Sequence, residues 1–324
     1  MRLLSSAALG AALCASVCIG VCLGVALWAQ TPAPAPPSGA VDTSQPEARF
    51  SGSITQVNVL FTVTDKKGRF VTDLNVNDFE LIEKKKPQFI QQFTAESDLP
   101  LRLALLIDTS NSIREQFHFE QQAAIRFMND VMRPKEDRML LVSFDSSPEL
   151  VSELTNNMVA LEKGVNGMRP GGGTSLYDAL YFAAKDKLMV DQPREKFRRA
   201  IILISDGEDT QSKYTRDQAL EMVQKSDSVI YAISTNTTRQ GTEGDEVLKY
   251  LTEETGGQAF FPFKVEDLDQ SFENIANELR HQYNIFYHPD PLQTDGLYHP
   301  ITLRVKTRKE LTVRARKGYY APKL

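Results

Sequence analysis

Oxygen-bearing side chains gather at three points of this 324-residue chain, two of them after apolar runs and one after a glycine triplet. The candidates are Asp108, Ser110, Ser112, Thr174 and Asp206. Carboxylate and hydroxyl oxygens are hard donors, which suit Mg²⁺, Ca²⁺ or Mn²⁺ and disfavour Zn²⁺ or Cu²⁺. If the fold brings these five side chains together, they can hold a divalent cation.

Such a cation site has room for a further ligand. Mg²⁺ takes six oxygens and keeps several waters, so five protein groups leave at least one position open. Two carboxylates only neutralise a divalent ion, which therefore still attracts another anion. The three glycines before Thr174 (Gly171–Gly173) let the loop backbone approach closely.

Strands that alternate with helices must position these residues. Near-continuous apolar runs predict strands buried on both faces, and helical patterns separate them. The alternation predicts an α/β fold, a doubly wound, mainly parallel six-stranded sheet over residues 100–283, with Ser175 and Asp178 spaced as a helix capping box. The predicted strands are 101–108, 138–144, 150–154, 199–205, 228–234 and 259–263, and the predicted helices are 115–132, 175–190, 215–226, 243–255 and 265–283. Carboxyl ends of parallel strands share one edge, which is where ligands bind in such sheets.

Segments 50–99 and 284–324 instead show the two-residue alternation of half-buried strands. The lysine run 84–87 reads as a solvated turn. Neither segment is large enough for a comfortable core of its own. We expect them to pair as one small β-sandwich into which the sheet domain is inserted, the alternative being two separate β appendages.

The first 29 residues predict export. Arg2 precedes an uncharged run through residue 29, which reads as a signal peptide, with an uncleaved membrane anchor as the alternative. Residues 30–49 form a Pro/Ala-rich linker. The expected location is secreted, periplasmic or at the cell surface, with membrane contact only through the leader if it is uncleaved.

Composition excludes several classes of function. All three cysteines lie within the leader, so thiol catalysis, thiolate metal sites and disulfides are excluded for the folded part. The formal net charge of −5 gives no basic footprint for nucleic acid.

The site pattern resembles the von Willebrand factor type A domain, also known as the integrin I domain, and its metal-ion-dependent adhesion site (MIDAS). Asp108, Ser110 and Ser112 match its DxSxS motif, Thr174 matches its distant threonine and Asp206 its distant aspartate. The flanking patterns VxVxFTVTDxxG and GYYAP look like a group of exported bacterial VWFA-related proteins. The resemblance implies that an Asp or Glu of a partner protein completes the metal shell. It also implies a mobile last helix, here residues 265–283, and we hypothesise that this helix couples ligand binding to the sandwich.

The resulting expectation is a protein-binding or adhesion module that is not an enzyme. A metal-dependent hydrolase is the less favoured alternative, because Ser110 stands where aspartyl phosphotransferases carry a second acid and neither serine has an evident His partner. An envelope scaffold with a purely structural metal is the third possibility. Glu208 and Asp209 are expected to form a solvated acidic rim.

Overall fold

The computed structural model describes residues 56–95, 99–114, 117–191, 196–236, 240–262 and 267–323. The predicted leader and the linker lie outside these residues. In the described part of the chain, no helix is both long and apolar enough to cross a bilayer.

A six-stranded sheet forms the centre of the α/β part, in the order β10-β9-β8-β5-β6-β7. Its strands are β5 (Leu101–Asp108), β6 (Arg138–Phe144), β7 (Pro148–Thr155), β8 (Arg198–Ser205), β9 (Ser228–Ser234) and β10 (Ala259–Phe260). Neighbouring strands are parallel except for β6 and β7, which are antiparallel. The predicted doubly wound, mainly parallel sheet is confirmed. Strand order reverses beside β5, where such folds bind ligands.

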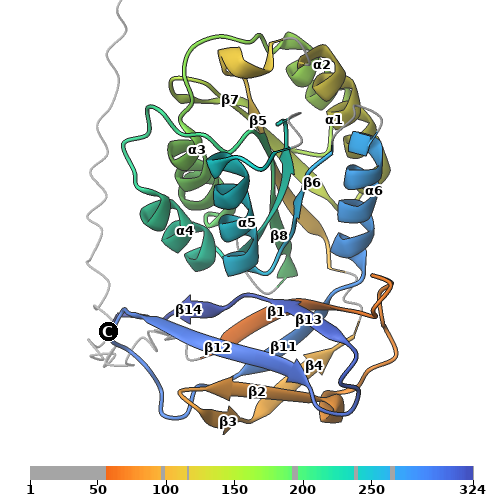
Figure 1. Ribbon diagram of the computed structural model, residues 1–324, viewed down its shortest axis with the longest axis vertical. Coiled ribbons are helices and arrows are strands. Elements are labelled where there is room, and N and C mark those ends of the chain that lie inside the picture. Colours follow the sequence, from red (N-terminus) through yellow and green to blue (C-terminus); the bar gives the residue numbers. More distant parts are fainter. Residues whose placement is uncertain are drawn as a thin grey trace, which may run out of the picture. The chain divides into compact units, whose positions relative to one another are not determined.

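Helices cover both faces of this sheet (Figure 1). One face carries α1 (Phe117–Val131), α2 (Met158–Gly167) and α6 (Asp267–Arg280), and the other carries α3 (Leu176–Phe182), α4 (Arg216–Lys225) and α5 (Glu243–Thr255). In β5, Leu103 and Leu105 pack on the first face, while Ala104 and Leu106 pack on the second. Burial on both faces explains why the strand is apolar without alternation.

Some predicted element boundaries differ from the structure. Helix α2 was not predicted, because Gly164 and Gly167 lower the helix propensity of its sequence. The predicted helix 175–190 turns into a π-helix at Ala183–Leu188. The predicted helix 265–283 ends at Arg280, and the last residue of that stretch, Tyr283, begins a strand instead.

Two four-stranded sheets, β13-β1-β11-β4 and β14-β12-β2-β3, form the sandwich (Figure 1). The strands are β1 (Val57–Thr64), β2 (Phe79–Glu83), β3 (Lys86–Gln88), β4 (Ile90–Thr94), β11 (Tyr283–Tyr287), β12 (Tyr298–Val305), β13 (Thr312–Ala315) and β14 (Gly318–Tyr320). Each sheet joins the two flanking segments, because β1 pairs with β11 and β2 pairs with β12. The expected shared sandwich is confirmed.

The lysine turn of this sandwich is shorter than predicted. Lys84 and Lys85 make the turn with φ values of 49° and 66°, whereas Lys86 and the proline after it belong to β3. The proline lies on an edge strand, where its missing N–H leaves no hydrogen bond of the ladder unmade.

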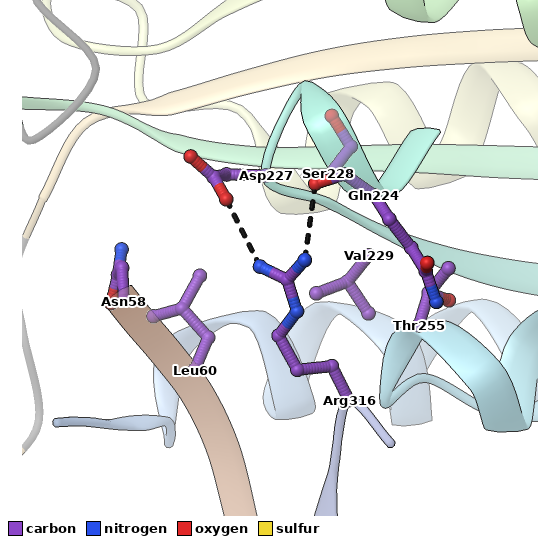
Figure 2. A pocket seen from close by; sticks show the side chains of 8 residues that line it. All are labelled: Asn58, Leu60, Gln224, Asp227, Ser228, Val229, Thr255 and Arg316. Carbon is purple, nitrogen blue, oxygen red and sulfur yellow. Dashed lines mark hydrogen bonds and ion pairs between the residues drawn. The ribbon is translucent and has the colours of Figure 1, made fainter. Parts of the chain in front are cut away.

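Arg316 ties the C-terminal strands to the helical layer (Figure 2). It lies between β13 and β14, and its guanidinium is 3.0 Å from an Asp227 carboxylate oxygen. It also donates to the Gln224 carbonyl at the end of α4, at 3.2 Å. Lys317 adds an exposed pair with Glu253 of α5, at 3.1 Å. The inserted arrangement therefore has specific polar contacts besides its two chain connections.

Candidate functional site

Asp108 is the last residue of β5 and its side chain is fully buried. One carboxylate oxygen accepts the Ser110 backbone N–H at 2.8 Å. The other accepts the hydroxyl of Ser205, the last residue of the neighbouring parallel strand β8, at 2.8 Å. These bonds fix the carboxylate between the ends of two adjacent strands.

Asp206 follows β8 and joins the two serines of the first loop. The Ser112 hydroxyl donates to an Asp206 carboxylate oxygen at 2.9 Å. The Ser110 and Ser112 hydroxyls are themselves 2.9 Å apart. Asp108 and Ser110 are buried, whereas Ser112 is exposed, so this cluster of four predicted site residues reaches the surface.

Thr174, the fifth predicted residue, is held beside the cluster through its backbone. Its carbonyl accepts N–H groups of Thr210 and Gln211 at 2.9 and 3.0 Å, which ties it to the loop after Asp206. On the other side, the Gly171 N–H donates to the Thr109 carbonyl at 2.6 Å. Thr174 is 5% exposed. The three loops that carry the predicted residues therefore lie together at one edge of the sheet.

Glycine is required at two positions of these loops. Gly172 has φ +71°, and a Cβ there would lie 2.6 Å from the Ser146 hydroxyl oxygen. Gly207 has φ +81°, and a Cβ there would lie 2.2 Å from the Gly244 carbonyl oxygen. Gly171, in contrast, has open space around a Cβ, so it contributes no close approach.

The predicted capping box of α3 is wrong. Ser175 makes no side-chain cap, and its buried hydroxyl oxygen has no hydrogen-bond partner in the described part of the chain. Asp178 instead accepts the backbone N–H groups of Lys213 and Tyr214, at 2.8 and 2.9 Å. The residue reaches a distant loop because that loop packs over the first turn of the helix.

Asp209, predicted to belong to a solvated rim, has a second role in holding this loop. Its carboxylate accepts the Ser212 hydroxyl at 2.5 Å and the Tyr177 N–H at 3.3 Å. With the bonds to Asp178, these contacts hold the loop after β8 against α3. Glu208 is exposed, as expected for the rim.

Glu120 of α1 is a third carboxyl at the site and, like Asp108, it is buried; the sequence reasoning missed it. It is 2% exposed, and one of its carboxylate oxygens has no hydrogen-bond partner among the described residues. Burial, with smaller contributions from the charges of Asp108 and Asp206, raises the pKa of Glu120 to about 8. A signal was present in the sequence, because Glu120 occupies the apolar face of its helix, in step with buried Phe117 and Ala124.

Asp108 shares this electrostatic situation. Burial, helped by the charge of Asp206, outweighs the hydrogen bonds from Ser110 and Ser205, and the pKa of Asp108 is raised to about 6. Within the described ranges, no ion pair involves Asp108, Glu120 or Asp206. When carboxyl groups lie close together in a buried site, their negative charges favour either protonation of one group or binding of a cation.

The donor set suits a hard divalent cation. Within the described residues, no three His, Cys, Asp or Glu side chains are grouped as a metal site. The candidate centre instead combines two carboxylates, Asp108 and Asp206, with the hydroxyls of Ser110, Ser112 and Thr174. Mg²⁺ is commonly bound through one or two carboxylates while it keeps other oxygen ligands, so this set fits its chemistry.

Comparisons with known proteins agree with the fold. Residues 103–208 match the model of the von Willebrand factor type A domain family. The chain contains a von Willebrand factor type A (VWA) domain. The match spans the predicted site loops from Asp108 to Asp206.

The UPF0353 protein of Mycolicibacterium gilvum is 26% identical over 202 residues, which cover 55% of this chain and 60% of that protein. Its counterpart in Mycolicibacterium vanbaalenii is 27% identical over the same length, with the same coverage. This chain therefore matches about three fifths of the length of these curated relatives.

Among solved structures, a von Willebrand factor type A protein from Catenulispora acidiphila has a TM-score of 0.49. It is 11% identical, and the alignment covers 82% of this chain and 74% of that one. Proximal thread matrix protein 1 of the mussel byssus, solved with a zinc-occupied MIDAS motif, has a TM-score of 0.47 at 16% identity. That alignment covers 60% of this chain and 48% of the mussel protein.

Proposed function

We propose that this protein is an exported binding module whose VWA domain holds a divalent cation and uses it to bind an acidic residue of a partner protein. Asp108, Ser110, Ser112, Thr174 and Asp206 would hold the cation. Mg²⁺ is the first choice, with Ca²⁺ and Mn²⁺ as alternatives, because all five side chains offer hard oxygen donors.

One observation carries this proposal. Two carboxylates, Asp108 and Asp206, meet at the ends of adjacent parallel strands, joined to two serine hydroxyls, and no ion pair of the described residues balances them. Ser205 and the Ser110 N–H hold Asp108 in place before any cation arrives, so little ordering is needed on binding. A divalent cation would supply the balancing positive charge and a centre that attracts a foreign carboxylate.

The protein's own groups keep the site open to such a ligand. Ser112 is exposed, and Asp206 is partly exposed, so the cluster is reachable from solvent. The loop that carries Thr174 is fastened to both neighbouring loops, which keeps this face rigid. A rigid, accessible site is suited to binding a partner with little rearrangement.

A binding role is favoured over catalysis because neither serine of the site has a histidine partner that would make it a nucleophile. The Ser112 hydroxyl donates to Asp206, and the Ser110 hydroxyl contacts Ser112. The described site contains no histidine that could take a proton from either hydroxyl. We therefore propose that the protein is not an enzyme.

The proposed location outside the cytoplasm rests on the leader pattern of residues 1–29. It places the binding site where a secreted or surface partner can reach it.

A pull-down from the native cell surface tests the function. The full-length protein, Asp108→Asn and Glu208→Gln are compared in Mg²⁺ and in chelator. Glu208→Gln is the matched control, because it removes one negative charge from an exposed side chain beside the site. We expect the wild type and Glu208→Gln to capture the same partners in Mg²⁺. These partners should be lost when chelator is added and when Asp108→Asn replaces the wild type. Partners that survive both treatments would contradict metal-dependent binding and favour the scaffold role.

A further inference from the structure

A groove of about 630 Å³ begins at Thr109, the residue after the proposed ligand Asp108, and continues between β7 and α2. Leu150 and Val151 line it from the strand, and Ala160 and Met168 line it from the helical side. The groove thus begins beside the candidate metal site, and its lining combines these apolar side chains with polar and charged ones.

Close packing fixes the wall of the groove. A Cβ on Gly164 of α2 would lie 3.0 Å from Leu141 of β6 and 3.1 Å from Val151 of β7, so the helix approaches the sheet closely here. Gly167, at the end of α2, also lines the groove, but a Cβ there would meet open space. A larger side chain at Gly167 can therefore enter the groove without disturbing the packing.

Two basic side chains stand along the groove. Lys163 and Arg169 both line it and are exposed, and in the described part of the chain neither forms an ion pair. The Arg169 guanidinium only donates to the carbonyls of Asn166 and Met168, at 2.8 and 2.7 Å. Two acidic side chains, Asp145 and Glu149, line the groove from the strand side, and Asp145 lies beside Gly172. The basic charge is therefore confined to the α2 side of the groove, and that side suits an acidic ligand.

We propose that the partner's segment continues from the metal site into this groove as an extended, doubly acidic peptide, an inference that rests on the proposed function. Its first acidic residue binds the cation. An apolar side chain then packs on Val151 and Met168, and a second acidic residue pairs with Lys163 and Arg169. Apolar contact supplies affinity, and the second charge pair sets which acidic segments are accepted.

A random twelve-residue peptide library, displayed on phage and selected on the full-length protein in Mg²⁺ with chelator elution, provides the probe. We expect the enriched peptides to carry two acidic residues with an apolar residue between them. One such peptide is then synthesised, and its affinity is measured for the variants Lys163→Glu, Arg169→Glu and Gly167→Leu. Each should bind it about tenfold or more weakly, the size expected for the loss of one charge pair or one buried contact.

Lys213→Glu is the matched control, since Lys213 is an exposed lysine on the loop after β8, outside the groove. It should bind the peptide within about twofold of wild type, since rim charges without a partner add little. Mg²⁺ uptake, measured by calorimetry on each variant, should be unchanged in all four, because none replaces a proposed metal ligand.

The outcomes separate this inference from the proposed function. If the peptides need Mg²⁺ and Asp108 but bind the groove variants as they bind wild type, the groove assignment is wrong and the function stands. Peptides with a single acidic residue as the only consensus would also overturn the groove assignment. If binding survives chelator or Asp108→Asn, or if no chelator-sensitive peptide is enriched, both are contradicted.

Discussion

The two ends of the central sheet bury charge in opposite ways. At the amino ends of β5 and β8, Arg102 pairs with Asp191 at 2.6 Å, and the buried Asp137 pairs with Arg280 at 2.5 Å. At the carboxyl ends of the same strands, Asp108, Asp206 and Glu120 lie near one another, and none has an ion pair within the described ranges.

This difference distinguishes charged side chains that stabilise the fold from charged side chains that are available for binding. Buried charges are tolerated when each finds an opposite partner and its hydrogen bonds, as Asp137 does. Where carboxyls are buried without such a partner, burial raises their pKa values and neighbouring like charges add to the rise, as at Asp108 and Glu120. Groups perturbed in this way mark candidate functional sites. Replacing one of these acidic side chains by a neutral one should therefore change the free energy of unfolding in different directions at the two ends. The replacement should destabilise the protein at the amino end and should be neutral or stabilising at the carboxyl end.

Asp137→Ala should give the largest effect. Asp137 accepts the backbone N–H groups of Leu101 and Arg133 at 2.7 and 2.8 Å besides pairing with Arg280. Its loss removes the two backbone hydrogen bonds and the buried ion pair together and should lower the free energy of unfolding by about 3–5 kcal/mol. Urea denaturation measures the change. Glu136→Ala, which removes only a surface pair with Arg133, should change it by less than about 1 kcal/mol.

Gly207→Ala should follow, at about 2–3 kcal/mol of destabilisation. The new methyl group would stand 2.2 Å from the Gly244 carbonyl oxygen in a backbone conformation with φ +81°, so it adds overpacking to backbone strain. Because Asp206 is the preceding residue, Mg²⁺ affinity should fall as well.

Gly171→Ala is the matched control for Gly207, since its Cβ meets nothing within 4 Å. Its free energy of unfolding should equal that of wild type within about 0.5 kcal/mol. Equal free energies of unfolding for the two variants would show that the tight approach at Gly207 does not hold the site.

Glu120→Gln should stabilise the metal-free protein at alkaline pH by about 1–3 kcal/mol, since one unit of pKa shift corresponds to about 1.4 kcal/mol. Folded Glu120, with its pKa of about 8, keeps its proton up to about pH 8, whereas the unfolded chain releases it near the ordinary pKa of 4.5. The folded state thus binds more protons between these values, so wild-type stability falls as pH rises from about 4.5 to 8.

Urea denaturation in chelator at pH 5, 7 and 9 follows this change. The Glu120→Gln curve should be flatter than that of wild type, and that of exposed Glu208→Gln should match wild type. Parallel pH profiles for wild type and Glu120→Gln would refute the buried-charge interpretation of the carboxyl end.

Thr174→Ala should have the smallest effect on stability, about 1 kcal/mol or less, because the contacts that place Thr174 run through its backbone. Its Mg²⁺ affinity should nevertheless drop about tenfold, the size expected for loss of one oxygen ligand. Thr174→Ser keeps the hydroxyl and should retain affinity. Calorimetric titration compares the three proteins, and equal affinities for all would remove Thr174 from the proposed ligand set.

The sheet and its site loops were predictable because their signals are local. The run Leu101–Asp108 is apolar throughout, which identifies a strand buried on both faces, and an acid at its end then falls at the carboxyl edge. Ser228–Ser234 and Glu243–Thr255 were predicted with the bounds they have in the structure.

Contacts between distant segments could not be predicted in the same way. Asp178 was assigned to a local capping box, yet it accepts N–H groups from a loop 35 and 36 residues away. Glu120 was overlooked because its role depends on Asp108 and Asp206, which approach it only in the folded chain. Helix α2 was missed because packing of Gly164 on β6 and β7 favours the helix where propensity does not.

Calorimetric titration of the folded, full-length protein with Mg²⁺ tests the central claim most directly, with Mn²⁺ and Ca²⁺ as parallel titrants. We predict uptake of a divalent cation by wild type and by Glu208→Gln, and loss of that uptake in Asp108→Asn. Folded wild type that takes up none of the three ions, or Asp108→Asn that takes them up as wild type does, would contradict the assignment of the carboxyl edge as a metal centre.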